Sequence, residues 1–273
     1  MEKKNTSQKT GITYYMSQQN VQNRFEQILG KKAQGFISSV INTVNSSKQL
    51  QACDPQTILK SAAVAASLDL PVDKNLGFAW IIPYGNEASF QMGYKGYIQL
   101  ALRSGEYSRL NAVPVYKNQF THYNALTEEL DADFSIDGEG DVVGYAFYFR
   151  LVNGFEKQAY WSVDKVTKHA KRFSQAYKAK HSSPWDTDFD QMGLKTVIKN
   201  TLAKWGILSI EMQSALKHDQ GVVDSEDNIT YPDGVEFEDI AEEIEAQKAD
   251  EFDNDKEPDQ KKEKELFKDN NTQ

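Results

Sequence analysis

The segment GFAWIIPYGNEASFQMGYKGYIQLALRSG, residues 77–105, predicts a β-hairpin that leads directly into a helix. Its first part has two short runs of aromatic and β-branched residues on either side of a turn at residues 84–87. A second hairpin is predicted over residues 142–161, with its turn at Asn153-Gly154, and another strand over residues 107–116. Because hairpins outnumber any alternation of strands and helices, we expect an α+β fold with an antiparallel sheet.

Helices are predicted before the first hairpin. Residues 21–44 carry apolar residues at three- and four-residue steps, and Gly30 and Gly35 are expected to divide them into two helices. Asp54 is the expected N-cap of a further helix, which has proline at its first turn. The polar residues 1–20 lack this periodicity and are interpreted as a flexible arm.

The charge of the chain is divided unevenly. The whole sequence of 273 residues carries 31 Lys and Arg against 40 Asp and Glu. Residues 219–273 carry 6 Lys and Arg against 20 Asp and Glu, which leaves 25 against 20 for residues 1–218. We therefore expect a mildly basic core at residues 21–218. The acidic residues 219–273 are expected to be a largely disordered tail of the kind that can recruit partners, with one short helical segment near residues 237–244.

The single cysteine, Cys53, excludes an intramolecular disulfide, and residues 1–20 contain no apolar leader. No run approaches the ~18 apolar residues of a membrane span. These features predict a cytoplasmic protein that does not enter a membrane.

The common signatures of catalytic sites are missing from the sequence. Neither residues 93–97 nor residues 29–33 match the P-loop pattern, whose backbone amides, lysine and hydroxyl hold a nucleotide. Asp186, Asp188 and Asp190 alternate as in a cation loop, but the glycine and distal glutamate of a calcium loop are absent, which favours charge complementarity at a helix start. We therefore predict no enzyme activity, no cofactor and no bound metal, and leave open an effect of magnesium on assembly.

Three predicted helices repeat one arrangement of apolar and basic residues. At about 100° per residue, residues 94–104 place Tyr94 and Tyr97 on one face and cations on another. The helix capped by Ser162 and the helix that ends at Gly206 repeat the pattern. A plain amphipathic helix with a solvated face is the alternative for each of them.

Taken together, the basic rows and the many aromatic residues favour a positive groove for single-stranded DNA, in which cations follow phosphates and rings stack on bases. About one in four of the aromatic residues Trp80, Trp161, Trp185 and Tyr177 is expected to face DNA, and the others to pack in the core. The residues predicted to contact DNA are Lys95, Gln99, Arg103, Lys165, Lys168, Arg172, Lys178, Lys180, Lys195 and Lys199.

Three ordered blocks resemble the RecT family of phage single-strand annealing proteins. They are SLDLPVDKNLGFAWIIPYGNEASFQMGYKGYIQLALRSGEY, then VVGYAFYFRLVNGFEK with AYW, and then PWDTDFDQMGLKTVIKNTLAKWGILSIEMQ. The resemblance extends over roughly residues 21–213. It implies an α+β core with a deep, positive DNA groove, bordered by a long basic helix that contains Lys195 and Lys199. Leu194 stands where relatives often carry another basic residue, so one contact of the family is missing here.

The resemblance also implies an activity and partners. The protein would coat single-stranded DNA as an oligomeric ring or helical filament and pair complementary strands in recombination without ATP. Its C-terminal region would bind a phage exonuclease and the single-strand binding protein of the bacterial host. Three alternatives stay open: a passive single-strand binding protein, a metal-dependent DNA-processing enzyme with carboxylates such as Asp73, Asp188 and Asp190, and a scaffold that acts through its acidic tail.

Overall fold

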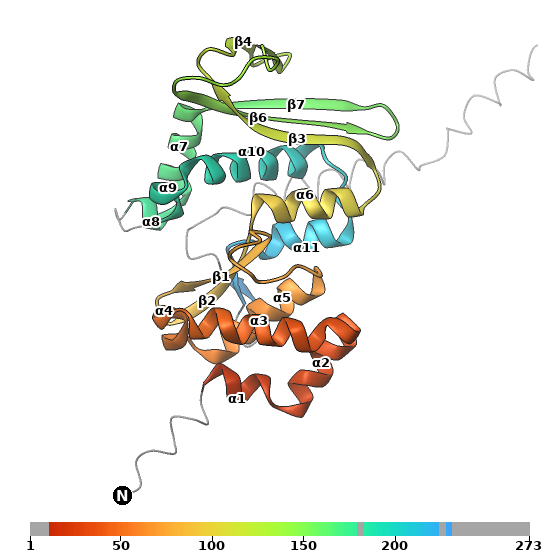
Figure 1. Ribbon diagram of the computed structural model, residues 1–273, viewed down its shortest axis with the longest axis vertical. Coiled ribbons are helices and arrows are strands. Elements are labelled where there is room, and N and C mark those ends of the chain that lie inside the picture. The colour runs from red at the N-terminus through yellow and green to blue at the C-terminus, as the bar shows by residue number, and fades with distance from the viewer. Residues whose placement is uncertain (1–10, 179–182, 224–227, 231–273) are drawn as a thin grey trace, which may run out of the picture. The chain divides into compact units, whose positions relative to one another are not determined.

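Figure 1 shows the computed structural model, which describes residues 11–178, 183–223 and 228–230. All of these residues fall within one unit, Met1–Val235. The predicted helical segment near residues 237–244 and most of the acidic tail lie outside the described residues, as does Lys180.

The N-terminal part of this unit is helical. Gly30 has a φ of 55°, a conformation that glycine adopts readily, and it starts a 3-10 turn between two helices. Asp54 caps a helix as predicted, because its carboxylate accepts a hydrogen bond from the backbone N–H of Gln56 at 3.0 Å. The helices are α1 (Ile12–Met16), α2 (Gln19–Leu29), the 3-10 turn Gly30–Lys32, α3 (Ala33–Asn45), α4 (Lys48–Ala52) and α5 (Pro55–Ser67).

Two expectations for this part are corrected. Residues 11–20 are not an arm without structure, since Ile12 and Met16 of α1 are buried against the neighbouring helices. Gly35 does not divide the helices but lies inside α3, because propensity alone costs a glycine only ~1 kcal/mol in a helix.

The predicted hairpin and helix of residues 77–105 are confirmed. Strands β1 (Ala79–Tyr84) and β2 (Glu87–Met92) form an antiparallel pair that ends at the turn, where Tyr84 lies opposite Glu87. Helix α6 (Tyr94–Arg103) follows. Gly96 lets the start of α6 approach the chain before β1, since a Cβ there would lie 2.3 Å from the carbonyl oxygen of Phe78. These two elements therefore form one closely packed structure.

The main sheet has the order β3-β6-β7, and all of its strands are antiparallel. Its long hairpin turns at Asn153 and Gly154 as predicted, and Gly154 has a φ of 92°. The hairpin β4–β5 and the pair β8–β9 were not predicted. The strands are β3 (Tyr107–Tyr116), β4 (Phe120–Asn124), β5 (Glu129–Ala132), β6 (Val142–Leu151), β7 (Glu156–Ser162), β8 (Val222–Val223) and β9 (Ile229–Thr230).

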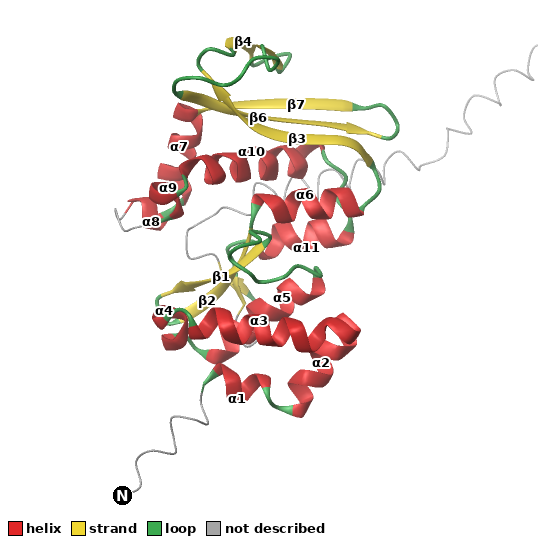
Figure 2. Cartoon of the chain, in the orientation of Figure 1, coloured by secondary structure: helices red, strands yellow, loops and turns green. Residues whose placement is uncertain are grey.

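The C-terminal helices lie against this sheet and against α6. The longest of them, α10, runs along one face of the sheet, where it contacts β3, β6 and β7 as well as α6 (Figure 2). Ser162 caps α7 as predicted, by accepting a hydrogen bond from the backbone N–H of Lys165. The helices are α7 (Val163–Phe173), α8 (Gln175–Lys178), α9 (Pro184–Thr187), α10 (Phe189–Trp205) and α11 (Ile210–His218).

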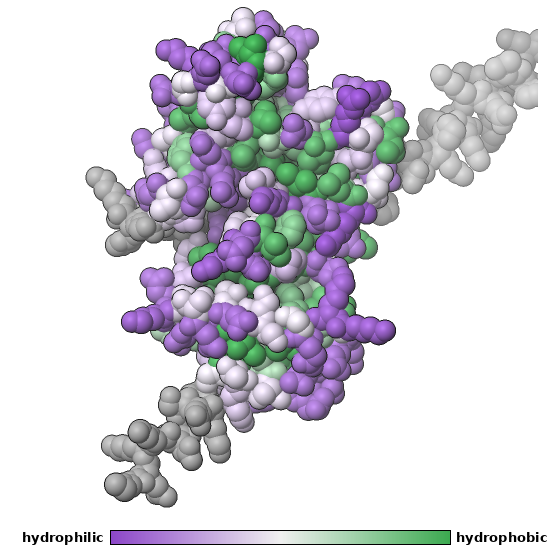
Figure 3. Space-filling model, in the orientation of Figure 1, coloured by the Kyte–Doolittle hydropathy of each residue, from purple (hydrophilic) through white to green (hydrophobic). Residues whose placement is uncertain are grey.

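The mixed α+β class with antiparallel pairing of its strands is therefore confirmed. In Figure 3, hydrophilic residues cover much of the face in view, and hydrophobic residues show mainly in the region of α6 and β3. Among the described residues, no helix combines the length and apolar character that crossing a membrane requires.

Candidate nucleic-acid interface

The packing of α10 determines where its lysines lie. Gly193 faces β6, and a Cβ at this position would lie 2.4 Å from the ring of Tyr145. The hydroxyl of Tyr145 donates a hydrogen bond to Asp190 at 2.6 Å, in the first turn of α10. The helix is thus held close to the sheet. Lys195 and Lys199, one turn apart on the same side of α10, are both buried.

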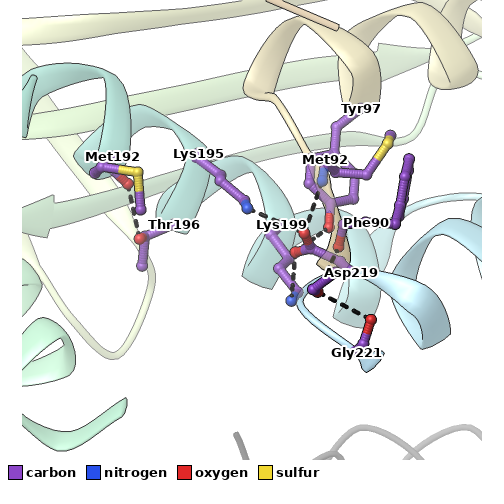
Figure 4. A network of polar contacts seen from close by, with 10 residues as sticks. Phe90, Met92, Tyr97, Met192, Lys195, Thr196, Lys199, Asp219 and Gly221 are labelled. Carbon is purple, nitrogen blue, oxygen red and sulfur yellow. Dashed lines mark hydrogen bonds and ion pairs between the residues drawn. The ribbon is translucent and has the colours of Figure 1, made fainter. Parts of the chain in front are cut away.

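Asp219 binds both lysines (Figure 4). Its Oδ1 accepts hydrogen bonds from Lys195 Nζ at 3.1 Å and from the backbone N–H of Met92 at 2.8 Å. Its Oδ2 accepts from Lys199 Nζ at 2.8 Å and from the Tyr97 hydroxyl at 2.8 Å. Asp219 is fully buried, while Lys195 and Lys199 are 6% and 8% exposed. Each carboxylate oxygen has two donors, so the buried charge is both paired and hydrogen-bonded.

This environment fixes the protonation of the network. Burial by itself would raise the pKa of Asp219, but the positive charges of Lys195 and Lys199 outweigh it and hold the pKa well below its ordinary value. Burial and the negative charge of Asp219 raise the pKa of the Tyr97 hydroxyl well above its ordinary value. Asp219 is therefore ionised and Tyr97 protonated at neutral pH.

The structure places the two leading candidates differently from expectation. The ammonium groups of Lys195 and Lys199 face a carboxylate of the same chain instead of an open surface. Contact between these lysines and DNA stays a prediction, and it requires a phosphate to compete with Asp219. Sequence reasoning assigned Asp219 to the acidic tail. That boundary is corrected, because Asp219 is fully buried and the β8 residue Val222 is also buried.

The three candidates on α6 differ in their contacts and exposure. Lys95 is exposed and Gln99 is half-buried. The guanidinium of Arg103 donates hydrogen bonds to the carbonyl oxygens of Leu68 and Asp69, at 2.9 and 3.0 Å. Arg103 therefore ties α6 to the end of α5, although its side chain, like that of Lys95, is exposed.

A group of cations and rings on β7 and α7, here called the α7 cluster, consists of Trp161, Lys165, His169, Arg172 and Phe173. Lys165 Nζ lies 4.0 Å from the centroid of the Trp161 ring, and the Arg172 guanidinium lies 4.8 Å from that of Phe173. The His169 ring contacts both Trp161 and Phe173, with centroids 5.6 and 4.6 Å apart. Lys165 and Arg172 are exposed, so the cluster presents cations over aromatic faces to solvent.

Lys165 and Arg172 are the two cations of the α7 cluster. Burial, followed by repulsion from Lys199, Arg172 and Lys165, lowers the pKa of His169 to about 4. His169 is therefore neutral at pH 7. Helix α10, which carries Lys199, contacts α7.

A second group, the Trp205 cluster, was missed by sequence reasoning. Lys157 Nζ lies 4.1 Å and Lys204 Nζ 5.3 Å from the centroid of the Trp205 ring, which is 39% exposed. Lys157 also forms an ion pair with Glu128. The adjacent Lys204 and Trp205 were a usable signal, but Lys157 comes from β7 and only folding brings it to this ring.

The remaining candidates differ in their surroundings. Lys168 is exposed and pairs with Asp164 at 2.6 Å, and Lys178 is exposed at the end of α8. Trp185 is buried against the rings of Tyr177 and Phe189, so it belongs to the core.

Two of the three aspartates Asp186, Asp188 and Asp190 accept hydrogen bonds that stabilise the start of α9 and of α10. Asp186 accepts hydrogen bonds from the backbone N–H and the hydroxyl of Ser183 in a capping box. Asp190 accepts from Tyr145, as described above. Within the described residues, no group of three or more His, Cys, Asp or Glu is arranged to hold a metal ion.

Comparison with known proteins identifies one family. The model of the RecT family matches residues 34–233. The uncharacterized protein YqaK of Bacillus subtilis (strain 168) is 51% identical over 201 residues, which cover 74% of this chain and 69% of YqaK. Protein RecT of Escherichia coli (strain K12) is 28% identical over 180 residues, 62% of this chain and 64% of that protein.

Proposed function

The chain belongs to the RecT family, and from this membership we propose that it binds single-stranded DNA and anneals complementary strands during recombination. The observation that carries the proposal is the α7 cluster, in which exposed cations lie over aromatic rings. This combination suits a polymer of phosphates and planar bases. Passive coating of single strands is the second candidate, because the same surface would serve it.

Each group in the interface has a distinct task in this mechanism. Lys165 and Arg172 neutralise phosphates, while Trp161 and Phe173 offer faces on which bases stack at ~1–3 kcal/mol each by alanine substitution. Lys157, Lys204 and Trp205 repeat the same chemistry on the neighbouring elements. All of these contacts read the backbone and the faces of the bases, so binding is independent of sequence.

Annealing then needs no bond to be made or broken by the protein. Neutralised phosphates reduce the repulsion between two strands, and base pairing with the second strand supplies both specificity and free energy. ATP has no role in such a reaction, and no enzyme activity is proposed. The protein would work in the cytoplasm of the bacterial host of a phage or prophage.

Self-association is part of the proposal. Five exposed apolar side chains, here called the apolar patch, support it, since such patches mark interaction sites. Hydrogen bonds join the segments that carry these side chains. The Val152 N–H donates to the Glu106 carbonyl oxygen, and the Ile207 N–H donates to the Tyr107 hydroxyl. The patch consists of Leu102, Val152, Phe155, Ile207 and Ile210. We propose that a second copy of the chain covers it in a ring or filament.

The exonuclease and the host single-strand binding protein stay proposed partners of the C-terminal region.

A stopped-flow assay tests the proposed activity. Two complementary, dye-labelled oligonucleotides are mixed with the full-length protein, with and without ATP and with and without magnesium. Faster pairing that ATP does not alter is expected. Tight binding without faster pairing would leave a passive coat protein, and cleavage of an oligonucleotide that depends on magnesium would point to a processing enzyme.

The salt dependence of binding tests the interface. Replacing Lys165 and Arg172 with alanine should reduce the slope of log affinity against log salt by ~0.7 for each phosphate contact that is lost. The same prediction stands for Lys195 and Lys199. Lys31→Ala is the control, because Lys31 is exposed on a different element. Variants with the slope of the wild type would remove the substituted residues from the interface.

A further inference from the structure

A small pocket lies between the β1–β2 hairpin and the segment that begins α10. Its volume is about 300 Å³, at the lower end of the range for ligand pockets. No residue of the α7 or Trp205 clusters lines it, but Lys195 does. The pocket therefore adjoins the proposed interface without being part of the surface described above.

Two aromatic residues line the pocket. Trp80 lies in β1, and its ring packs closely against Gly93, where a Cβ would lie 2.6 Å from it. Tyr94, the first residue of α6, also lines the pocket, and both residues are only partly buried. The pocket thus offers partly exposed aromatic surface.

Gln91 places a side-chain amide at the pocket. It lies directly opposite Trp80 in the hairpin, so both side chains extend from the same face. Gln91 is 9% exposed and lines the pocket. Within the described part of the chain, its side-chain amide makes no hydrogen bond, and neither its oxygen nor its nitrogen is enclosed by protein atoms. A group that enters the pocket can therefore form a hydrogen bond with it.

We infer that this pocket binds one nucleobase of the bound single strand. The base packs against Trp80 and Tyr94, its edge pairs with the Gln91 amide, and the attached phosphate competes with Asp219 for Lys195, which also lines the pocket. An amide both donates and accepts, so it matches an edge of any base, and the pocket needs no sequence preference. This inference rests on the proposed function and names the part of the DNA that enters the molecule.

A comparison of two ligands with two proteins tests the inference. The ligands are an oligothymidylate and an oligonucleotide of the same length that is abasic at every position, so that no binding register can place a base in the pocket. The proteins are the full-length wild type and Gln91→Met, which keeps the size of the side chain and removes its amide. The control is Gln56→Met, at an exposed glutamine of α5 outside the pocket.

Gln91→Met should bind oligothymidylate about 2- to 13-fold more weakly than the wild type, the factor expected for one hydrogen bond. It should bind the abasic strand as the wild type does, and the control should leave both affinities unchanged. The variant should also be about as stable as the wild type in urea, because the Gln91 amide makes no hydrogen bond within the described part of the chain that the change would break.

Two results would overturn the inference in different ways. Equal effects of Gln91→Met on both ligands, or no effect on either, would show that no base contacts Gln91 while leaving the proposed function intact. A wild-type protein that binds neither ligand would overturn the proposed function, and the pocket assignment with it.

Discussion

Asp219 holds together the buried network beneath the proposed interface. Its carboxylate joins β2, α6 and α10 through four hydrogen bonds. A buried carboxylate of this kind is costly to form, but removing one partner of a buried ion pair costs more than the pair contributes. Substituting Asp219 therefore tests the whole network, whereas substituting either lysine tests one of its ion pairs.

Asp219→Asn should lower the free energy of unfolding by about 3–5 kcal/mol, because two buried ammonium groups lose their counter-ion. Urea denaturation measures this loss. Asp164→Asn is the matched control, since Asp164 pairs with Lys168 on the surface and should contribute at most ~1 kcal/mol. Equal effects of the two substitutions would contradict the network shown in Figure 4.

His169 predicts a dependence of stability on pH. Its pKa of about 4 in the folded protein lies below the ordinary value of 6.5, so the unfolded chain binds the proton more tightly. Its contribution to stability is complete above about pH 6.5 and is lost as the pH falls toward about 4. The contribution of Asp219 to stability is lost only in more acidic solution. The ordinary pKa of an aspartate already lies below this pH window, and the surroundings of Asp219 in the folded protein lower it further.

Comparing the urea midpoints of the wild type and His169→Phe at about pH 7.5 and about pH 5, on either side of the ordinary pKa, measures this contribution. Phenylalanine keeps a ring against Trp161 and Phe173 and cannot be protonated. The variant should lose less stability than the wild type on acidification. An identical loss in both proteins would mean that His169 is not held neutral by its surroundings.

Among the elements, α10 determines the geometry of the proposed interface. Its first turns are held against β6 at Gly193, its middle carries the buried lysines, and its end presents Lys204 and Trp205. A shift of this helix would move all three groups together. The distance between α10 and the sheet therefore decides where all three groups lie.

Gly193→Ala should destabilise the protein by about 1–3 kcal/mol, the usual cost of overpacking, because the new Cβ would lie 2.4 Å from the ring of Tyr145. Gly35→Ala provides the matched control inside another helix. Nothing lies within 4 Å of a Cβ at Gly35, so this change should stabilise α3 by about 0.5–1 kcal/mol. Thermal denaturation of both variants checks the opposite signs, and two changes of the same sign would refute the close contact at Gly193.

For the molecule as a whole, the interface and the apolar patch use different residues. The α7 and Trp205 clusters present cations and rings, whereas the patch presents aliphatic side chains and Phe155. The proposed function therefore predicts that binding of DNA and self-association can be disturbed one at a time.

Ile210→Glu should weaken self-association, since Ile210 is 83% exposed in the apolar patch and contact with a second copy would bury the new charge. Folding should not suffer at so exposed a position. Leu126→Glu is the control, at a leucine that is 93% exposed in the β4–β5 turn. Sedimentation velocity measures the size of the assembly, and an unchanged size for Ile210→Glu would remove the patch from the contact between copies.

The amino-acid sequence was sufficient for features that depend on neighbouring residues. The hairpin turns, the caps at Asp54 and Ser162, and the start of α6 all follow from the chemistry of a few successive positions. The α+β class could also be read from the sequence, because hairpins outnumber any alternation of strands and helices, and so could the resemblance to the RecT family, because three ordered blocks carry it.

Folding alone brought together groups that are far apart in the chain. Asp219 lies 24 residues from Lys195 and 127 from Met92, and no local pattern indicates that they meet. Periodicity shows which face of a helix carries a lysine, but the segment that packs against that face decides whether the lysine meets solvent or a carboxylate. The burial of Lys195 and Lys199, the pairing of Lys157 with Trp205 and the pocket at Gln91 therefore had to come from the tertiary structure.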